Sequence, residues 1–192
     1  MGLAPGPDPG SERHTPTVNR RDTAMMGDVM FKGILTVAAG LSVAMLCGAG
    51  QAQQLPKSGT FSINSGWKAN GELVQVGEGR MFGWGGFYGV TFNQRGSGPL
   101  HMGQAVCSYT LDLTAGAGPG RGACAWTDAD GDKIFTDYTG TLGTDGVFNG
   151  MNQITGGTGK FSGITGKAAF QAKALSTQGH FGATQQFEYR LP

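Results

Sequence analysis

The segment from residue 156 to residue 163 has the residue types of a phosphate-binding loop, in the order Gly-Gly-Thr-Gly-Lys-Phe-Ser-Gly. Such a loop needs a Gly five residues before the Gly-Lys pair, and a Ser or Thr directly after the Lys to hold Mg²⁺. These two positions hold Ile154 and Phe161. We therefore predict that the segment binds no nucleotide. We expect a Gly-rich turn that leads into a strand, with Phe161 anchored in the core and Lys160 in solvent.

A second segment with chemical potential carries three carboxylates at alternate positions, on Asp128, Asp130 and Asp132. This spacing resembles the start of a calcium-binding loop. The match ends there, because Lys133 replaces the Gly of such a loop and Thr139 replaces its bidentate Glu. A β-hairpin with a two-residue turn at 130–131 accounts for the same residues and would pair Asp128 with Lys133. We favour the hairpin and keep calcium binding at the three aspartates as the alternative.

The other residue types used in catalysis are not arranged in a known pattern. His101 and His180 do not have the spacing of metal ligands, and no Gly-x-Ser-x-Gly nucleophile turn is present. We therefore predict no metal and no cofactor, and we assign no catalytic residue. If the protein were an enzyme, Arg80, His101 and Tyr109 would be its candidate polar groups, and they would have to meet in one cavity.

The amino-terminal region predicts an exported protein. Residues 34–47 are an unbroken run of apolar and small residues, which follows Lys32 and precedes Gly50 and Ala52. The run has about 14 residues where a membrane-spanning helix needs about 20, so we expect no stable membrane anchor. We assign residues 1–29 to a non-native or disordered extension, 30–52 to a signal peptide and 53–192 to a single domain. The expected location is the periplasm or the extracellular medium.

Export bears on the two cysteines of the predicted mature chain, Cys107 and Cys124. Because exported proteins meet an oxidising environment, we predict a disulfide between them, with two separate buried thiols as the alternative.

The charge of the chain excludes nucleic-acid binding as a function. The chain has 14 Lys and Arg against 13 Asp and Glu, a formal net charge of +1, and it has no basic run with interleaved aromatic residues. We therefore expect no nucleic-acid binding.

From residue 59 onward, apolar and polar residues alternate in short segments, and glycines interrupt every candidate helix. The pattern predicts an all-β domain with very little helix and eight or nine strands. The expected strands are 59–68, 72–79, 80–94, 101–113, 121–129, 132–140, 146–154, 159–174 and 180–191. A closed antiparallel barrel is favoured because closure removes exposed strand edges. Candidates for lining a pocket in such a barrel are Phe82, Trp84, Tyr88 and Tyr109, with simple core packing as the alternative.

The Ile-Thr-Gly-Gly-Thr-Gly-Lys-Phe segment at 154–161 resembles a Gly-Gly-Thr-Gly-Lys-Phe segment of dirigent proteins and allene oxide cyclase-like barrels. The wider layout, with residues 88–92, the cysteine spacing and the 128–132 hairpin, resembles uncharacterised exported bacterial proteins with that barrel. The resemblance implies an eight-stranded antiparallel barrel of the calycin-like kind. In characterised relatives such a barrel holds an apolar or phenolic substrate and often uses no cofactor.

Three functional hypotheses follow from these observations. We favour a non-catalytic exported barrel that binds a small apolar ligand or an envelope component. The alternatives are a cofactor-free cyclase or isomerase, and a structural surface protein whose barrel is filled by side chains. Nothing in the sequence assigns an oligomeric state.

Overall fold

The structure is a computed structural model, and it describes residues 55–192. The extension and the signal peptide predicted at 1–52 lie outside the described residues. Within the described part, no helix is long and apolar enough to cross a membrane.

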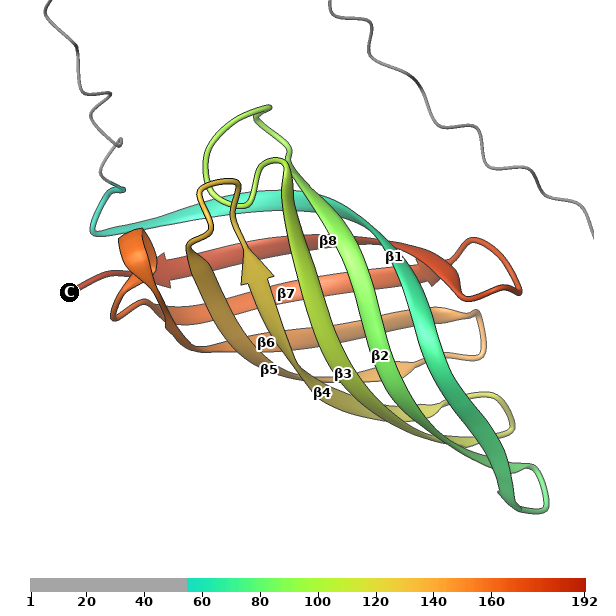
Figure 1. Ribbon diagram of the computed structural model, residues 1–192. Helices are drawn as coiled ribbons and strands as arrows, with labels where there is room; N and C mark the ends of the chain where they lie inside the picture. Colours follow the sequence, from blue (N-terminus) through green and yellow to red (C-terminus); the bar gives the residue numbers. More distant parts are fainter. Residues whose placement is uncertain (1–54) are drawn as a thin grey trace, which may run out of the picture. The chain divides into compact units, whose positions relative to one another are not determined.

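Eight antiparallel strands form a closed barrel in which each strand pairs with its neighbours in sequence and β1 pairs with β8 (Figure 1). The strands are β1 (Ser58–Gly77), β2 (Arg80–Asn93), β3 (Gly103–Thr114), β4 (Gly118–Thr127), β5 (Lys133–Leu142), β6 (Val147–Gly157), β7 (Thr165–Ala174) and β8 (His180–Arg190). A short 3-10 helix, η1 (Gly159–Phe161), precedes β7. The predicted fold class is therefore confirmed, with eight strands.

The two largest differences from the predicted strands each have a local reason. The chain does not turn near residue 70, because β1 continues through Gly71, which pairs with Gly85 of β2. A Cβ at Gly71 would clash with the Trp84 carbonyl, so the glycine allows the two backbones to approach closely there. In the other case, the predicted strand 159–174 begins only at Thr165, because η1 comes first.

The two ends of the barrel differ in how the chain closes them. At one end, which we call the packed end, the connections are 94–102, 128–132 and 158–164. They bury Leu100, Phe161 and Ile164, each at most 2% exposed, against the core that also contains Phe61 and Phe187. At the other end, the short-turn end, the connections are 78–79, 115–117, 143–146 and 175–179. Space inside the barrel is therefore expected toward the short-turn end.

Candidate ligand-binding cavity

The barrel encloses a cavity of about 260 Å³ that reaches the short-turn end. Aromatic side chains supply much of its wall, namely Trp67, Phe87, Trp126, Tyr138, Phe148, Phe170 and Phe181. Near the short-turn end the cavity contacts Gly146, Ser176, Gly179 and His180. An interior of this composition is suited to an apolar molecule.

The aromatic wall is held in place by ring-to-ring packing. Trp67 stacks on Phe181 with ring centroids 5.8 Å apart, and it meets Trp126 edge to face at 5.5 Å. On the opposite side, Phe170 stacks on Phe148 at 5.7 Å and meets Tyr138 edge to face at 5.9 Å. These separations lie in the range of favourable aromatic pairs, so the wall has a defined shape before any ligand enters.

Glycines on neighbouring strands make room for these rings. A Cβ at Gly89 would clash with the Trp67 ring, and a Cβ at Gly150 would clash with the Phe170 ring. Gly89 is the cross-strand partner of Trp67, and Gly150 is the partner of Phe170. The glycines inside the strands therefore allow large side chains from adjacent strands to lie flat across the barrel interior.

The predicted disulfide between Cys107 and Cys124 is confirmed. The two residues are direct cross-strand partners on β3 and β4, and their Cα atoms are 4.0 Å apart. Both cysteines line the cavity, so the disulfide joins two adjacent strands of its wall.

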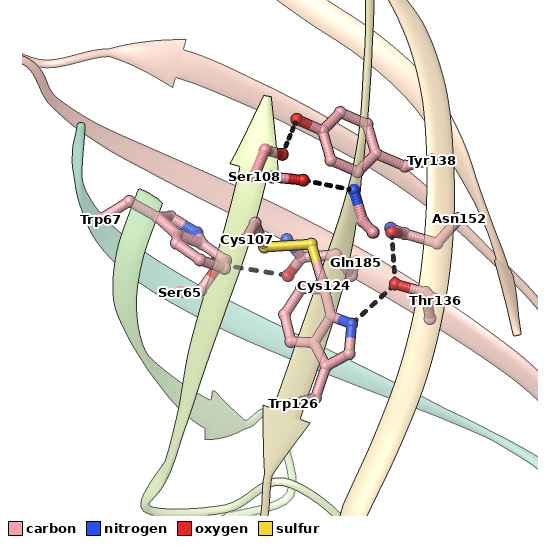
Figure 2. Close-up of a disulfide and its surroundings, with 11 residues drawn as sticks. Ser65, Trp67, Cys107, Ser108, Cys124, Trp126, Thr136, Tyr138, Asn152 and Gln185 are labelled. Carbon is pink, nitrogen blue, oxygen red and sulfur yellow. Dashed lines mark hydrogen bonds between the residues drawn. A yellow bond between two sulfur atoms is a disulfide. The ribbon is translucent and has the colours of Figure 1, made fainter. Parts of the chain in front are cut away.

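Two chains of buried hydrogen bonds connect tryptophans to amide side chains at the cavity (Figure 2). In the first chain, Trp126 Nε1 donates to Thr136 Oγ1 at 2.9 Å, and Thr136 donates to Asn152 Oδ1 at 3.0 Å. The second chain has the same chemistry. Trp67 Nε1 donates to Ser65 Oγ at 2.7 Å, and Ser65 lies 3.1 Å from Gln185 Oε1. Asn152 and Gln185 both line the cavity although they are only 2% and 5% exposed. Each indole N–H and each hydroxyl in these two chains therefore has a hydrogen-bond partner, as buried polar groups generally do.

Tyr138 is the most buried ionisable residue among those that line the cavity. Burial is the main cause that raises the pKa of its phenol, and the nearby Tyr109 raises it further. Its hydroxyl donates to the Ser108 carbonyl at 3.0 Å. The phenol therefore stays neutral at physiological pH, and its proton is engaged in the hydrogen bond to Ser108.

The structure corrects the prediction of which aromatic residues face inward. Trp84 and Tyr88 lie on the outer surface, 41% and 54% exposed, and Phe82 shares their outward parity on β2. None of the three lines the inner cavity. The inward positions of β2 hold Phe87 and glycines such as Gly89, because the interior there is filled by rings from β1 and other strands.

The polar groups proposed for an enzyme do not meet. Tyr109 points inward and stacks on Phe87 with centroids 4.5 Å apart, but it is not among the residues that line the cavity. Arg80 lies at the outer surface, where its Nη2 is 2.5 Å from Asp112 Oδ2. His101 lies in the loop between β2 and β3, at the packed end. These three residues therefore form no common site.

The acidic loop lies at the packed end and is built differently from the predicted hairpin. Thr127 pairs with Lys133, so residues 128–132 form a longer loop in place of a two-residue turn. Lys160 is not solvated as predicted. Its Nζ is 2.8 Å from Asp128 Oδ2 and 2.6 Å from Asp130 Oδ2. Asp132 accepts a hydrogen bond from the backbone N–H of Lys160 at 3.0 Å. Calcium binding by the three aspartates stays a prediction, and in the structure an ammonium group occupies the space beside two of them.

The sequence matches no protein-family model and no curated protein sequence. Among solved structures, the chain is similar to the pterocarpan synthase dirigent protein GePTS1, with 17% sequence identity and a TM-score of 0.45. The similarity covers 71% of this chain and 92% of that chain. The chain itself is a closed barrel of eight antiparallel strands.

Proposed function

We propose that the protein is a non-catalytic binder of a small, mainly apolar molecule, which it holds inside the barrel. The observation that carries this proposal is the cavity of about 260 Å³ with its aromatic wall. An apolar molecule that enters it leaves water and gains roughly 25 cal/mol for each Å² of apolar surface that it buries. A barrel interior filled by side chains would have no such space, so the cavity argues against the purely structural alternative.

The volume of the cavity indicates the size of the ligand. An engineered protein cavity of about 150 Å³ accommodates benzene. A cavity of about 260 Å³ is therefore sized for a molecule of two fused rings. The edge-to-face and stacked rings of the wall offer flat surfaces to such a molecule.

The ionisable groups of the wall support binding over catalysis. Those among the lining residues are Tyr138, Lys173 and His180. Tyr138 is neutral and its proton is bonded to the Ser108 carbonyl, while Lys173 and His180 are exposed near the short-turn end. A cyclase or isomerase needs an acid or base aimed at the bound molecule. Turnover of a bound molecule that is lost in Tyr138→Phe would favour the enzymatic alternative.

We also propose that the protein works outside the cytoplasm. The disulfide between Cys107 and Cys124 supports this proposal, because such bonds form and persist in oxidising compartments. Together with the apolar run at 34–47, it is consistent with removal of a signal peptide.

Native mass spectrometry of the protein from its own envelope or culture medium tests both proposals. We expect a mature chain that begins near residue 53, carries the intact disulfide and retains one small molecule. A chain that keeps residues 30–52 or has two free thiols would contradict export. Protein that carries no small molecule and takes up no two-ring aromatic probe would contradict the binding function.

A further inference from the structure

We propose that the ligand carries a hydrogen-bond acceptor, in the manner of an aromatic ketone, and that the amide N–H of Asn152 binds it. This inference rests on the proposed binding function and narrows the class of ligand. Its basis is the direction of the hydrogen bonds that run from Trp126 through Thr136 to Asn152.

The direction of these bonds follows from the chemistry of the three groups. An indole N–H can only donate, so Thr136 Oγ1 must accept from Trp126. The threonine hydroxyl has one proton, and it donates this proton to Asn152 Oδ1. If the amide were turned over, the buried hydroxyl of Thr136, a residue only 1% exposed, would lose this acceptor. That loss is costly for a buried donor. The carbonyl side of Asn152 is therefore fixed toward Thr136.

The amide nitrogen of Asn152 is then the atom that does not face Thr136. Asn152 is one of the residues that line the cavity, and its amide nitrogen is the donor that the proposal assigns to a molecule inside it. Gln185 offers a second amide, but its orientation is less restricted. The proton of Ser65 can reach either Gln185 Oε1 at 3.1 Å or the Ala183 carbonyl at 3.2 Å. Asn152 is thus the donor whose orientation the fold determines.

The indole and phenol hydrogens of the wall are already engaged in hydrogen bonds. Both indoles donate to hydroxyl groups, and the Tyr138 phenol donates to the Ser108 carbonyl. A ligand that displaces water from Asn152 must replace the lost hydrogen bond with an acceptor of its own. Over most of its remaining surface the same ligand meets aromatic rings. These requirements describe a compact aromatic molecule with a carbonyl oxygen, and they disfavour both a pure hydrocarbon and an ammonium compound.

The test compares two molecules of nearly equal shape, 1-tetralone and tetralin, which differ by the ketone oxygen. Binding is followed through the fluorescence of Trp67 and Trp126, in a Trp84→Phe background that removes the exposed tryptophan. We expect 1-tetralone to bind about tenfold more tightly than tetralin. The ketone oxygen accepts a hydrogen bond from Asn152, whereas bound tetralin leaves that buried donor without a partner. In Asn152→Leu, which keeps the size of the side chain, the two dissociation constants should become equal within about twofold.

A second pair of variants tests the role of Thr136 as a positioning residue. Thr136→Val removes the hydroxyl that accepts from Trp126 and donates to Asn152, and it should reduce the preference for 1-tetralone. Thr136→Ser keeps the hydroxyl and should retain the preference. Thr139→Val is the matched control, because Thr139 lies on the same strand with its side chain exposed. It should leave the preference unchanged.

The outcomes separate the two proposals. If neither molecule binds the unaltered cavity, the proposed binding function fails. If both bind equally well, the cavity binds ligands but the acceptor inference is wrong. A preference for 1-tetralone that persists in folded Asn152→Leu protein would show that Asn152 is not the donor.

Discussion

Replacement of Lys160 by Met should destabilise the barrel, although the sequence alone predicted an inert surface lysine. The Asp128 side chain is 4% exposed, and its partner Lys160 Nζ is 2.8 Å away. Removal of one partner from a buried ion pair costs about 3–5 kcal/mol, because the other charge stays buried without compensation. The Lys160 side chain is 25% exposed, so water weakens this pair. We therefore expect Lys160→Met to lower the free energy of unfolding by about 2 kcal/mol.

Urea denaturation followed by circular dichroism measures this loss, and an exposed ion pair supplies the control. Lys167 Nζ is 3.7 Å from Glu188 Oε2, and both side chains are more than half exposed. Lys167→Met should therefore change stability by less than about 0.5 kcal/mol. In a double-mutant cycle, Asp128→Asn should cancel much of the effect of Lys160→Met. Equal losses in Lys160→Met and Lys167→Met, or no coupling to Asp128, would refute the reasoning.

The same ion pair has a predicted dependence on pH. Burial acts to lower the pKa of Lys160, but hydrogen bonds and charge from Asp128 and Asp130 outweigh it and raise the pKa above 10.5. The folded state therefore holds the proton more tightly than the unfolded state. The stabilisation is complete below pH 10.5 and is lost as the pH rises through the folded pKa. A stability difference between wild type and Lys160→Met that grows above this pH would contradict the assignment.

Three further predictions concern the cavity wall. Gly89→Ala should destabilise the barrel by about 1–3 kcal/mol through overpacking against an indole ring, whereas Gly66→Ala, which has open space around it, should be nearly neutral in the same urea titration. Joint replacement of Cys107 and Cys124 by Ala should lower the free energy of unfolding by about 3 kcal/mol, and an unchanged urea midpoint would argue against a stabilising bridge. The raised pKa of Tyr138 means that the unfolded chain loses this proton first, so stability should fall as the pH rises above the ordinary value of 10.0. This alkaline loss should be smaller in Tyr138→Phe, and identical pH profiles would count against the buried phenol.

Much of the barrel follows from local patterns in the sequence. Alternating apolar residues and Gly-rich turns locate the strands, because one face of each strand must be buried and the chain must reverse direction tightly. These local patterns do not predict that β1 is one continuous strand. The Asn70-Gly71 pair looks like a turn, and only the pairing of Gly71 with Gly85 shows that the strand passes through it.

The orientation of the β2 aromatics could not be decided from β2 alone. Trp84 and Tyr88 share one parity, whereas Gly83, Gly85 and Gly89 share the other, and burial of the larger side chains is the usual expectation. The inward glycines become understandable only when cross-strand pairing places Trp67 opposite Gly89. A ring from the adjacent strand occupies that part of the interior, so Trp84 and Tyr88 are left on the outside while Phe87 points inward.

The amide side chains of the cavity have a signal in the sequence that belongs to no catalytic motif. Gln185 has the same parity as Ala183 and Phe187 in β8, and all three are buried. Asn152 likewise has the parity of the buried Ile154 in β6. A polar residue at an apolar position of an alternating strand predicts a buried polar group. Its partners, however, come from other strands and required the register.

A variant that fills the cavity is the sharpest test of whether a small molecule binds inside the barrel. Ala172 lines the cavity and Ala169 is exposed on the same strand, so Ala172→Trp fills the space and Ala169→Trp is the matched control. The measurement is the dissociation constant of 1-tetralone for each folded variant. Ala172→Trp should weaken binding at least tenfold, or roughly 1.4 kcal/mol, while Ala169→Trp should bind as the wild type does. Equal affinity in both variants would place the ligand outside the barrel and contradict binding in the cavity.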